Sequence, residues 1–263
     1  MRALLAQLEP SGTPDVNAGR AAEIIRERGP DVDLVAFPEL YLTGYDLGQV
    51  GSVAIELDAA PLAAIAEAAA ESATAVAVGL AERRGRAIAN TLALIDERGG
   101  FLAPYRKTHL FGEEEAAFEP GDELIVADVA GSRIGLLICF DMEFPELARD
   151  LARAGAEALL TISANMEPFY GDHLIASQAR ALDNRLPHLY VNRCGTDAGL
   201  RFVGGTRVLR PDGTVAAEVE GDGESLLESD VDRPGTDDER VDYLAHLRDD
   251  LRVTNPTTTG GSR

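Results

Sequence analysis

Three residues of different chemistry stand out in this chain: an acid, an ammonium and a thiol. Lys107 is the single lysine among 24 lysine and arginine residues. Arginine is a planar fork that stays charged, whereas lysine offers a compact ammonium with three donors. A lysine kept in a chain that otherwise uses arginine therefore indicates a site that needs a point charge, although chance survival would leave the same composition.

The other two reactive groups each follow an apolar run. Glu39 comes directly after Leu34–Pro38, and Cys139 comes directly after Ile134–Ile138. Both runs are typical of buried strands in a mostly parallel sheet, and open α/β sheets place their sites at the carboxyl ends of strands. Lys107 also follows a short strand-like piece. We therefore expect Glu39, Lys107 and Cys139 at three strand ends.

Strand-like and helix-like stretches alternate along the chain. The patterns predict helices over 16–28, 58–72, 145–154, 173–186 and 242–251, and strands over 4–8, 34–38, 75–80, 91–96, 101–105, 124–129, 134–138, 158–162, 189–192, 207–209, 214–219 and 225–231. No linker divides the alternation, which favours one α/β domain with mixed sheets over residues 1–251. Residues 252–263 are polar and are predicted to form a flexible tail.

The composition limits the class of partner. The formal net charge is −21, and the acids are scattered along the chain. Such a surface repels phosphate backbones and anionic lipid, so the chain is expected to bind neither nucleic acid nor membranes. An acid excess suits a salt-rich cytoplasm, and the arginine bias suits a GC-rich genome equally well. Stability that rises between low and molar KCl would support the first explanation.

The expected location is a reducing cytoplasm. No apolar run reaches the roughly 18 residues of a membrane span, and the N-terminus becomes polar too early for a signal peptide. The two cysteines, Cys139 and Cys194, give no disulfide framework. From the residues alone we also expect no metal and no phosphate site, because the four histidines show no paired ligand spacing and no Gly-rich loop follows a strand.

Three motifs in order carry a resemblance to a known family. Phe37–Leu40, then Arg106–Phe111 with Phe118–Gly121, then Cys139–Glu146 resemble the nitrilase superfamily of carbon–nitrogen hydrolases. The separations between the Glu, Lys and Cys, 68 and then 32 residues, match as well. The resemblance extends to Leu244. It implies a four-layer α-β-β-α sandwich that pairs through its outer helices into a homodimer or larger homo-oligomer, without metal or organic cofactor.

The resemblance also implies catalytic roles. Cys139 would be the nucleophile and Glu39 the general base, because a thiol titrates near ~8.5 and needs a base or a cation to form thiolate at neutral pH. Lys107 and the backbone N–H of Phe140 would stabilise the oxyanion. Glu114 resembles the additional active-site glutamate of the family. Three acids stand in a row there, at 113–115, so the assignment is open by one position.

Two other side chains compete for these roles. His109 is a candidate partner for a Cys–His hydrolase, but the family pattern carries a histidine there without making it the base. That alternative predicts that His109→Ala abolishes activity while Lys107→Ala only reduces it. Cys194 lacks an acid–lysine context and is expected to be a buried, inert thiol.

The substrate is the least determined feature. Phe140 and Asp141 follow the cysteine and the chain has no tryptophan, which resembles the amidase branches more than the nitrile-hydrolysing ones. Segments 37–45, 141–146, 164–168 and 192–195 resemble amidases of 5-aminopentanamide and stereoselective amidases. By this resemblance Tyr41, Phe140, Glu143 and Asn165 would line the pocket, and Glu143 would receive a substrate ammonium or pair with a neighbouring arginine.

The sequence therefore predicts an amidase. It would release ammonia from a small aliphatic amide through a thioester on Cys139. An N-carbamoyl amine hydrolase and an ω-amidase are alternatives within the superfamily. A non-catalytic binding homologue is the alternative from another class, and the intact Glu39 and Lys107 argue against it.

Overall fold

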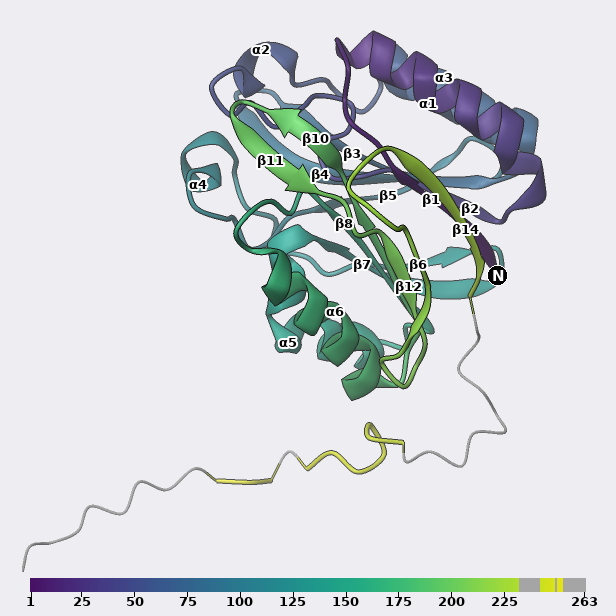
Figure 1. Cartoon of the computed structure of the whole chain (residues 1–263), viewed down its shortest axis with the longest axis vertical. Coiled ribbons are helices and arrows are strands. Elements are labelled where there is room, and N and C mark those ends of the chain that lie inside the picture. The colour runs from purple at the N-terminus through teal and green to yellow at the C-terminus, as the bar shows by residue number, and fades with distance from the viewer. Residues whose placement is uncertain (232–241, 249, 253–263) are drawn as a thin grey trace, which may run out of the picture.

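Two six-stranded mixed sheets make up the centre of the molecule (Figure 1). The computed structural model describes residues 1–231, 242–248 and 250–252. The first sheet has the order β14 (Ser225–Asp230), β1 (Arg2–Gln7), β2 (Leu34–Ala36), β3 (Ala75–Arg84), β4 (Ala87–Ile95) and β5 (Phe101–Arg106). The second has the order β13 (Val215–Glu218), β12 (Arg207–Leu209), β9 (His188–Asn192), β8 (Ala158–Ser163), β7 (Ser132–Ile138) and β6 (Val126–Val129).

Helices cover the outer face of each sheet, so the layers run α-β-β-α (Figure 1). The first sheet is covered by α1 (Pro14–Arg28) and α3 (Ala60–Ser72), and the second by α5 (Pro145–Arg153) and α6 (Tyr170–Asn184). This arrangement confirms the predicted four-layer sandwich. The connections add short helices α2 (Val50–Val53) and α4 (Glu114–Ala117), 3-10 turns at Gly29–Asp31 and Cys139–Glu143, and a hairpin of β10 (Cys194–Asp197) and β11 (Leu200–Val203).

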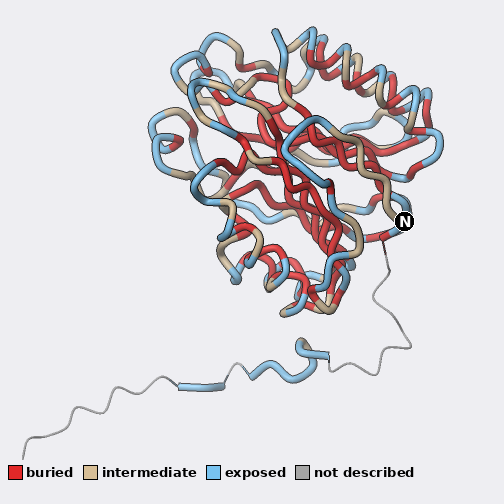
Figure 2. Tube along the Cα trace, in the orientation of Figure 1, coloured by how far each residue is buried: buried red, intermediate tan, exposed pale blue. Residues whose placement is uncertain are grey.

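Side-chain alternation along the strands builds the layers. In β1, Ala3 and Leu5 pack in the core between the two sheets, whereas Leu4 and Ala6 pack under α1 and α3. Successive side chains of a strand point to opposite faces, so a strand buried on both faces is apolar throughout. Figure 2 shows the resulting buried centre between exposed loops and outer helix faces.

Two features differ from the sequence prediction. The β10–β11 hairpin was not expected, because its turn residues Ala198 and Gly199, both at positive φ, are not an Asn-Gly or Asp-Gly signal. The helix predicted over Asp242–Leu251 is wrong for the residues described there, which form a turn at 243–246. A short segment that buries little apolar surface does not form a stable helix in water. Residues 253–263, most of the predicted tail, lie outside the described residues.

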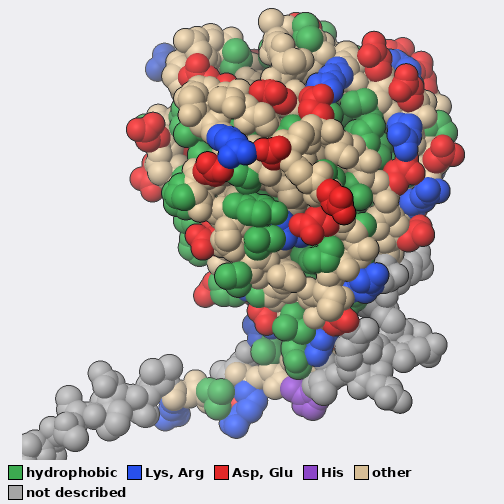
Figure 3. Space-filling model, in the orientation of Figure 1, with side chains coloured by type: hydrophobic (Ala, Val, Ile, Leu, Met, Phe, Trp, Pro, Cys, Tyr) green, Lys and Arg blue, Asp and Glu red, His purple; other side chains and the backbone are tan. Residues whose placement is uncertain are grey.

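The formal net charge of −21 makes the surface acidic. Figure 3 shows Asp and Glu side chains spread over the face in view, interspersed with arginines. Ion pairs that are at least partly exposed, such as Arg20–Glu224 and Arg26–Glu71, individually contribute little to stability. Within the described ranges, no helix is both long and apolar enough to cross a bilayer.

Acid is expected to destabilise the fold through His188. This buried imidazole on β9 bonds Thr161 Oγ1 at 2.8 Å and the Ser177 carbonyl at 3.1 Å, and burial lowers its pKa to about 4. The stabilisation from the neutral ring is complete above the ordinary pKa of ~6.5 and is lost as the pH falls through 4, about 3 kcal/mol in all. Urea unfolding of His188→Gln should show a flatter pH dependence in this window than wild type. The exposed His246→Gln is the control, and an equal slope in all three proteins would contradict the prediction.

Candidate active site

Four ionisable side chains meet where the strands of the two sheets end. Glu39 follows β2, Lys107 follows β5 and Cys139 follows β7. Lys107 Nζ lies 2.7 Å from Glu39 Oε1 and 2.9 Å from Glu114 Oε1. All four residues are buried. The fold thus brings together the acid, the ammonium and the thiol that the sequence placed at separate strand ends.

Glu39 is held by donors from both halves of the molecule. Asn90 Nδ2 on β4 donates to Glu39 Oε1 at 2.6 Å, and the backbone N–H of Ala164 after β8 donates to Oε2 at 2.7 Å. Together with Lys107, these donors hold both carboxylate oxygens in one orientation. A fixed carboxylate beside the thiol is what a general base requires.

Glu114 is the acid of the 113–115 run that reaches the site. Its neighbours Glu113 and Glu115 are exposed, whereas Glu114 is fully buried. Tyr45 OH donates to Glu114 Oε1 at 2.6 Å, and the N–H of Phe111 donates to Oε2 at 2.9 Å. The first turn of α4 therefore directs this carboxylate towards Lys107.

Burial and neighbouring charges shift the pKa values of Lys107 and Cys139. Burial opposes the charge of Lys107, but the carboxylates of Glu39 and Glu114 outweigh it and raise its pKa well above the ordinary value. Burial and the Glu39 carboxylate raise the pKa of Cys139, while Lys107 and a hydrogen bond from Ser163 lower it. Cys139 is thus a resting thiol, and Lys107 stays an ammonium. The Glu39 carboxylate lies next to both groups.

The turn that carries Cys139 is bound to the lysine segment by Asp141. Cys139 has φ 49°, a conformation that non-glycine residues adopt rarely. Asp141 is buried; its Oδ2 accepts from the N–H of Ile138 and from Tyr105 OH, and its Oδ1 accepts from the Thr108 hydroxyl. These bonds brace the strained turn and fix Cys139 relative to Lys107.

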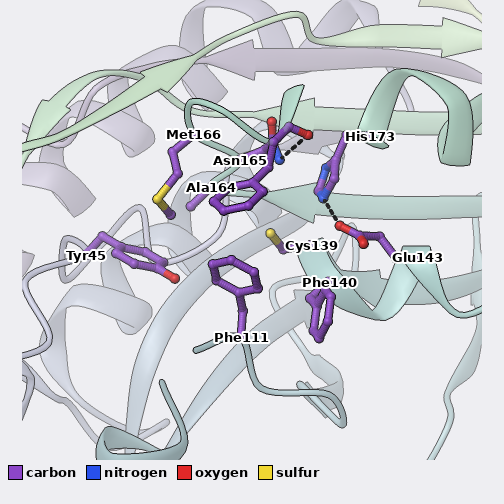
Figure 4. A pocket seen from close by; sticks show the side chains of 10 residues that line it. Tyr45, Phe111, Cys139, Phe140, Glu143, Ala164, Asn165, Met166 and His173 are labelled. Atoms are coloured by element: carbon purple, nitrogen blue, oxygen red, sulfur yellow. Dashed lines mark hydrogen bonds and ion pairs between the residues drawn. The ribbon is translucent and has the colours of Figure 1, made fainter. Parts of the chain in front are cut away.

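A small pocket opens in front of Cys139 (Figure 4). It has a volume of about 280 Å³ including its mouth, and its walls are Tyr45, Phe111, Phe140, Glu143, Ala164, Asn165, Met166, Phe169 and His173. The predicted residues Phe140, Glu143 and Asn165 are among them. The sequence prediction missed Tyr45, Phe111, Ala164, Met166, Phe169 and His173, although all of these except Phe169 and His173 lie inside segments that it used.

Two predictions about individual side chains, Tyr41 and the arginine partner of Glu143, need correction. Tyr41 does not line the pocket: it stacks on Phe37 in the core beneath α1 and α3, with ring centroids 5.1 Å apart. Glu143 pairs with His173 at 3.2 Å rather than with an arginine. His109, in contrast, was expected to be structural, and its stacking on Phe144 and contact with Asp141 agree with that expectation.

Gly79 is required for the position of Glu39. A Cβ on this residue of β3 would lie 2.4 Å from the Pro38 carbonyl oxygen and 2.7 Å from Glu39 Cα. Gly79→Ala should therefore displace Glu39, destabilise the fold by about 1–3 kcal/mol and lower kcat/KM about tenfold or more. Gly19→Ala is the control, since a Cβ there meets nothing within 4 Å. Equal activity of the two variants, measured with chemical denaturation of each, would refute this account.

Comparison with known proteins identifies the class. Residues 2–240 match the model of the carbon-nitrogen hydrolase family, and the chain belongs to that family. It is a hydrolase of carbon–nitrogen bonds other than peptide bonds, as predicted.

Particular relatives are amidases. The chain is 37% identical over 240 residues to an (R)-stereoselective amidase from Pseudomonas sp., covering 90% of this chain and 87% of that protein. It is 31% identical, with a TM-score of 0.85, to an amidase from Nesterenkonia sp. AN1 whose active-site cysteine carries a covalent acetamide moiety from fluoroacetamide, with 94% of each chain covered. A cysteine-to-alanine mutant of that amidase in complex with butyramide is similar too, at 31% identity, TM-score 0.84 and 94% of each chain. These relatives support the predicted cysteine-based hydrolysis of amides.

Proposed function

We propose that this protein hydrolyses small aliphatic amides to carboxylate and ammonia through a thioester on Cys139. The observation that carries the proposal is the buried ammonium of Lys107 held between the carboxylates of Glu39 and Glu114, next to Cys139. An oriented acid, a fixed cation and a thiol at the floor of a pocket are the parts that nucleophilic acyl transfer requires.

The first half of the reaction forms the thioester. Glu39 takes the thiol proton as the sulfur of Cys139 bonds to the amide carbonyl carbon. Two of the three N–H groups of Lys107 bind Glu39 and Glu114, which leaves the third for the oxyanion together with the N–H of Phe140. Glu39 then gives its proton to the amide nitrogen, the C–N bond breaks and ammonia leaves.

The second half releases the acid. Glu39 accepts a proton from water, whose oxygen bonds to the thioester carbon, and the same oxyanion donors stabilise the second tetrahedral intermediate. The C–S bond then breaks, the carboxylic acid leaves and ionises in solvent, and the proton on Glu39 returns to the sulfur of Cys139. In each half of the reaction Glu39 thus accepts one proton and later donates it, as general acid–base catalysis requires.

The pocket supports an aliphatic chain with an amino group. Phe111, Phe140 and Phe169 offer apolar surface to the aliphatic part of a small substrate. Asn165 Oδ1 is buried without a hydrogen-bond partner among the described residues, so it is available to an N–H donor. Glu143 supplies a carboxylate that an ammonium of the substrate would approach.

The same lining argues against a dicarboxylate monoamide. Of the described residues that line the pocket, Glu143 is an acid and none is arginine or lysine. A substrate carboxylate would be repelled by Glu143, and the lining histidine, His173, is already paired with that carboxylate. This favours the amidase over the ω-amidase, and an N-carbamoyl amine remains the second candidate because it also carries an amino group.

Ammonia release from a substrate panel tests the proposal. Wild type should hydrolyse pentanamide and 5-aminopentanamide, and hydrolyse glutaramate, N-carbamoylputrescine and pentanenitrile at least tenfold more slowly by kcat/KM. Glu143→Gln should lower activity on 5-aminopentanamide about tenfold more than activity on pentanamide. Glu146→Gln, an exposed acid nearby, is the control. Preference for N-carbamoylputrescine would move the assignment to the second candidate, and no hydrolysis by folded protein would refute amidase function.

Assembly and location are proposals of the same kind. Ile175 and Leu182 are apolar residues exposed on the outer helix α6, which supports pairing through outer helices into a homodimer or a larger homo-oligomer. The cysteines are free, which fits a cytoplasmic location. Light scattering on the purified chain tests the assembly, with Ile175→Glu expected to yield monomers.

A further inference from the structure

A series of hydrogen bonds connects the pocket wall to Cys139. Glu143 Oε1 lies 3.2 Å from His173 Nε2 (Figure 4), and His173 Nδ1 lies 2.8 Å from Tyr190 OH. Tyr190 OH lies 3.3 Å from Ser163 Oγ, and the Ser163 hydroxyl hydrogen-bonds to Cys139. The series therefore begins and ends on residues that line the same pocket.

The three inner residues are deeply buried and take no part in the mechanism above. His173 is 2% exposed, and Tyr190 and Ser163 are fully buried. They belong to α6, β9 and β8, so the series runs from the outer helix through the second sheet to the nucleophile. Buried polar groups stabilise a fold only when their hydrogen bonds are satisfied. Here these groups satisfy one another, in a row that ends at the sulfur.

The protonation of His173 decides the direction of the row. When the ring is neutral with its hydrogen on Nε2 towards Glu143, Nδ1 has to accept the hydroxyl hydrogen of Tyr190. Tyr190 then has no hydrogen left for Ser163. When both ring nitrogens carry hydrogen, Nδ1 donates to Tyr190, Tyr190 donates to Ser163, and the Ser163 hydrogen is free to point at Cys139. A thiolate accepts hydrogen bonds, so this second arrangement stabilises it.

We propose that Glu143, His173, Tyr190 and Ser163 form a relay that stabilises the thiolate of Cys139, with the imidazolium form of His173 setting its direction. The relay residues are positioning residues, because only Ser163 contacts a reacting atom. The inference rests on the proposed role of Cys139 as nucleophile. It also connects substrate binding to catalysis, since a substrate group at Glu143 acts on the same carboxylate that holds His173.

Other charged groups lie around His173. Glu143 of the 3-10 turn is the acid 3.2 Å from its Nε2. Arg207 of β12 has its guanidinium 5.6 Å from the Tyr190 ring centre, and Arg180 lies on α6. The further titratable groups on the packed elements are His188 of β9, Tyr170 of α6, which bonds Arg207, and the exposed Asp172.

Alkylation of Cys139 by iodoacetamide, a neutral reagent, tests the relay without any amide substrate. The measurements use a Cys194→Ala background, so that one thiol reacts, and record the rate as a function of pH. Ser163→Ala and Tyr190→Phe should each slow alkylation about tenfold at neutral pH and move the half-maximal rate to higher pH. Tyr41→Phe is the matched control, because that hydroxyl is buried without a hydrogen-bond partner among the described residues, and it should react like wild type.

Double variants separate a relay from independent effects. The double variant Ser163→Ala/Tyr190→Phe should be alkylated no more slowly than Ser163→Ala alone. Ser163→Ala already interrupts the series of hydrogen bonds, so a second interruption in the same series has no further effect. Glu143→Gln should slow alkylation in the wild-type background and change nothing in the Tyr190→Phe background. Wild-type rates in Tyr190→Phe, or additive losses in the double variants, would overturn the proposal.

Two further comparisons separate the relay from misfolding of a variant and from the proposed amidase function. If Tyr190→Phe does not fold, Glu143→Gln in the Ser163→Ala background gives the same test, and its side chain is 29% exposed. Alkylation that follows these predictions in a protein that hydrolyses no amide would support the relay and refute the proposed function. Amide hydrolysis by a protein whose alkylation rate is unaffected by the relay variants would support the proposed function and refute the relay.

Discussion

Cys139→Ala is expected to abolish amide hydrolysis, lowering kcat by at least about 10⁴-fold, because the covalent step loses its nucleophile. Cys139 is the free thiol that lies beside Glu39 and Lys107 at the floor of the pocket. Alanine leaves the packing of this buried position almost unchanged, so the loss should occur without a large change in stability. Steady-state ammonia release and urea unfolding measure the two quantities.

The second cysteine is the natural control for this variant. Cys194 is also buried and free, and burial raises its pKa to about 12, but it does not line the pocket. Cys194→Ala should keep kcat/KM within about threefold of wild type. Activity that survives Cys139→Ala and disappears in Cys194→Ala would identify Cys194 as the nucleophile and refute the assignment to Cys139.

Lys107→Arg is expected to cost about 10³-fold in kcat although the charge is kept, since losing one oxyanion donor costs about 10²–10³. Lys107 is 1% exposed and its ammonium fits between two carboxylates at 2.7 and 2.8 Å. A guanidinium is larger and planar, so it cannot present one N–H to the oxyanion while the others bind Glu39 and Glu114 in the same space. The loss should appear in kcat more than in KM, because the missing bond forms in the transition state.

The adjacent arginine supplies the matched exchange. Arg106 binds Glu82 through two bonds of 2.7 and 2.8 Å outside the pocket. Arg106→Lys makes the opposite substitution one residue away and should change kcat by less than about threefold. If Lys107→Arg were as active as Arg106→Lys, the compact ammonium would not be what the site requires.

Much of this protein is determined by local sequence. Apolar runs of strand length that end in Glu39 and Cys139 predict both the buried strands and the side of the sheet on which the groups lie, because parallel strands place their carboxyl ends together. The alternation of strands and amphipathic helices predicts the layers. Lys107 is conspicuous by composition alone, and its motif places it after a strand. These features depend on neighbours in sequence, so the sequence shows them directly.

Other features were decided by tertiary structure. Which acid of 113–115 reaches Lys107 depends on the first turn of α4, since one residue rotates a side chain by about 100° around a helix. Tyr41 and Tyr45 are four residues apart, but the turn at Leu40, with φ 52°, sends Tyr41 into the core and Tyr45 to Glu114.

The contacts of Glu143 could not be predicted from the sequence for a related reason. Its partner His173 lies thirty residues away on α6, and the relay from there to Cys139 needs Tyr190 and Ser163 from two different strands. A single sequence carries no signal for which distant polar side chains become neighbours. Local sequence patterns identified the reactive side chains of this chain. Packing between distant elements decided which polar side chains contact them, because hydrogen bonds form only between groups that the fold brings within about 3 Å.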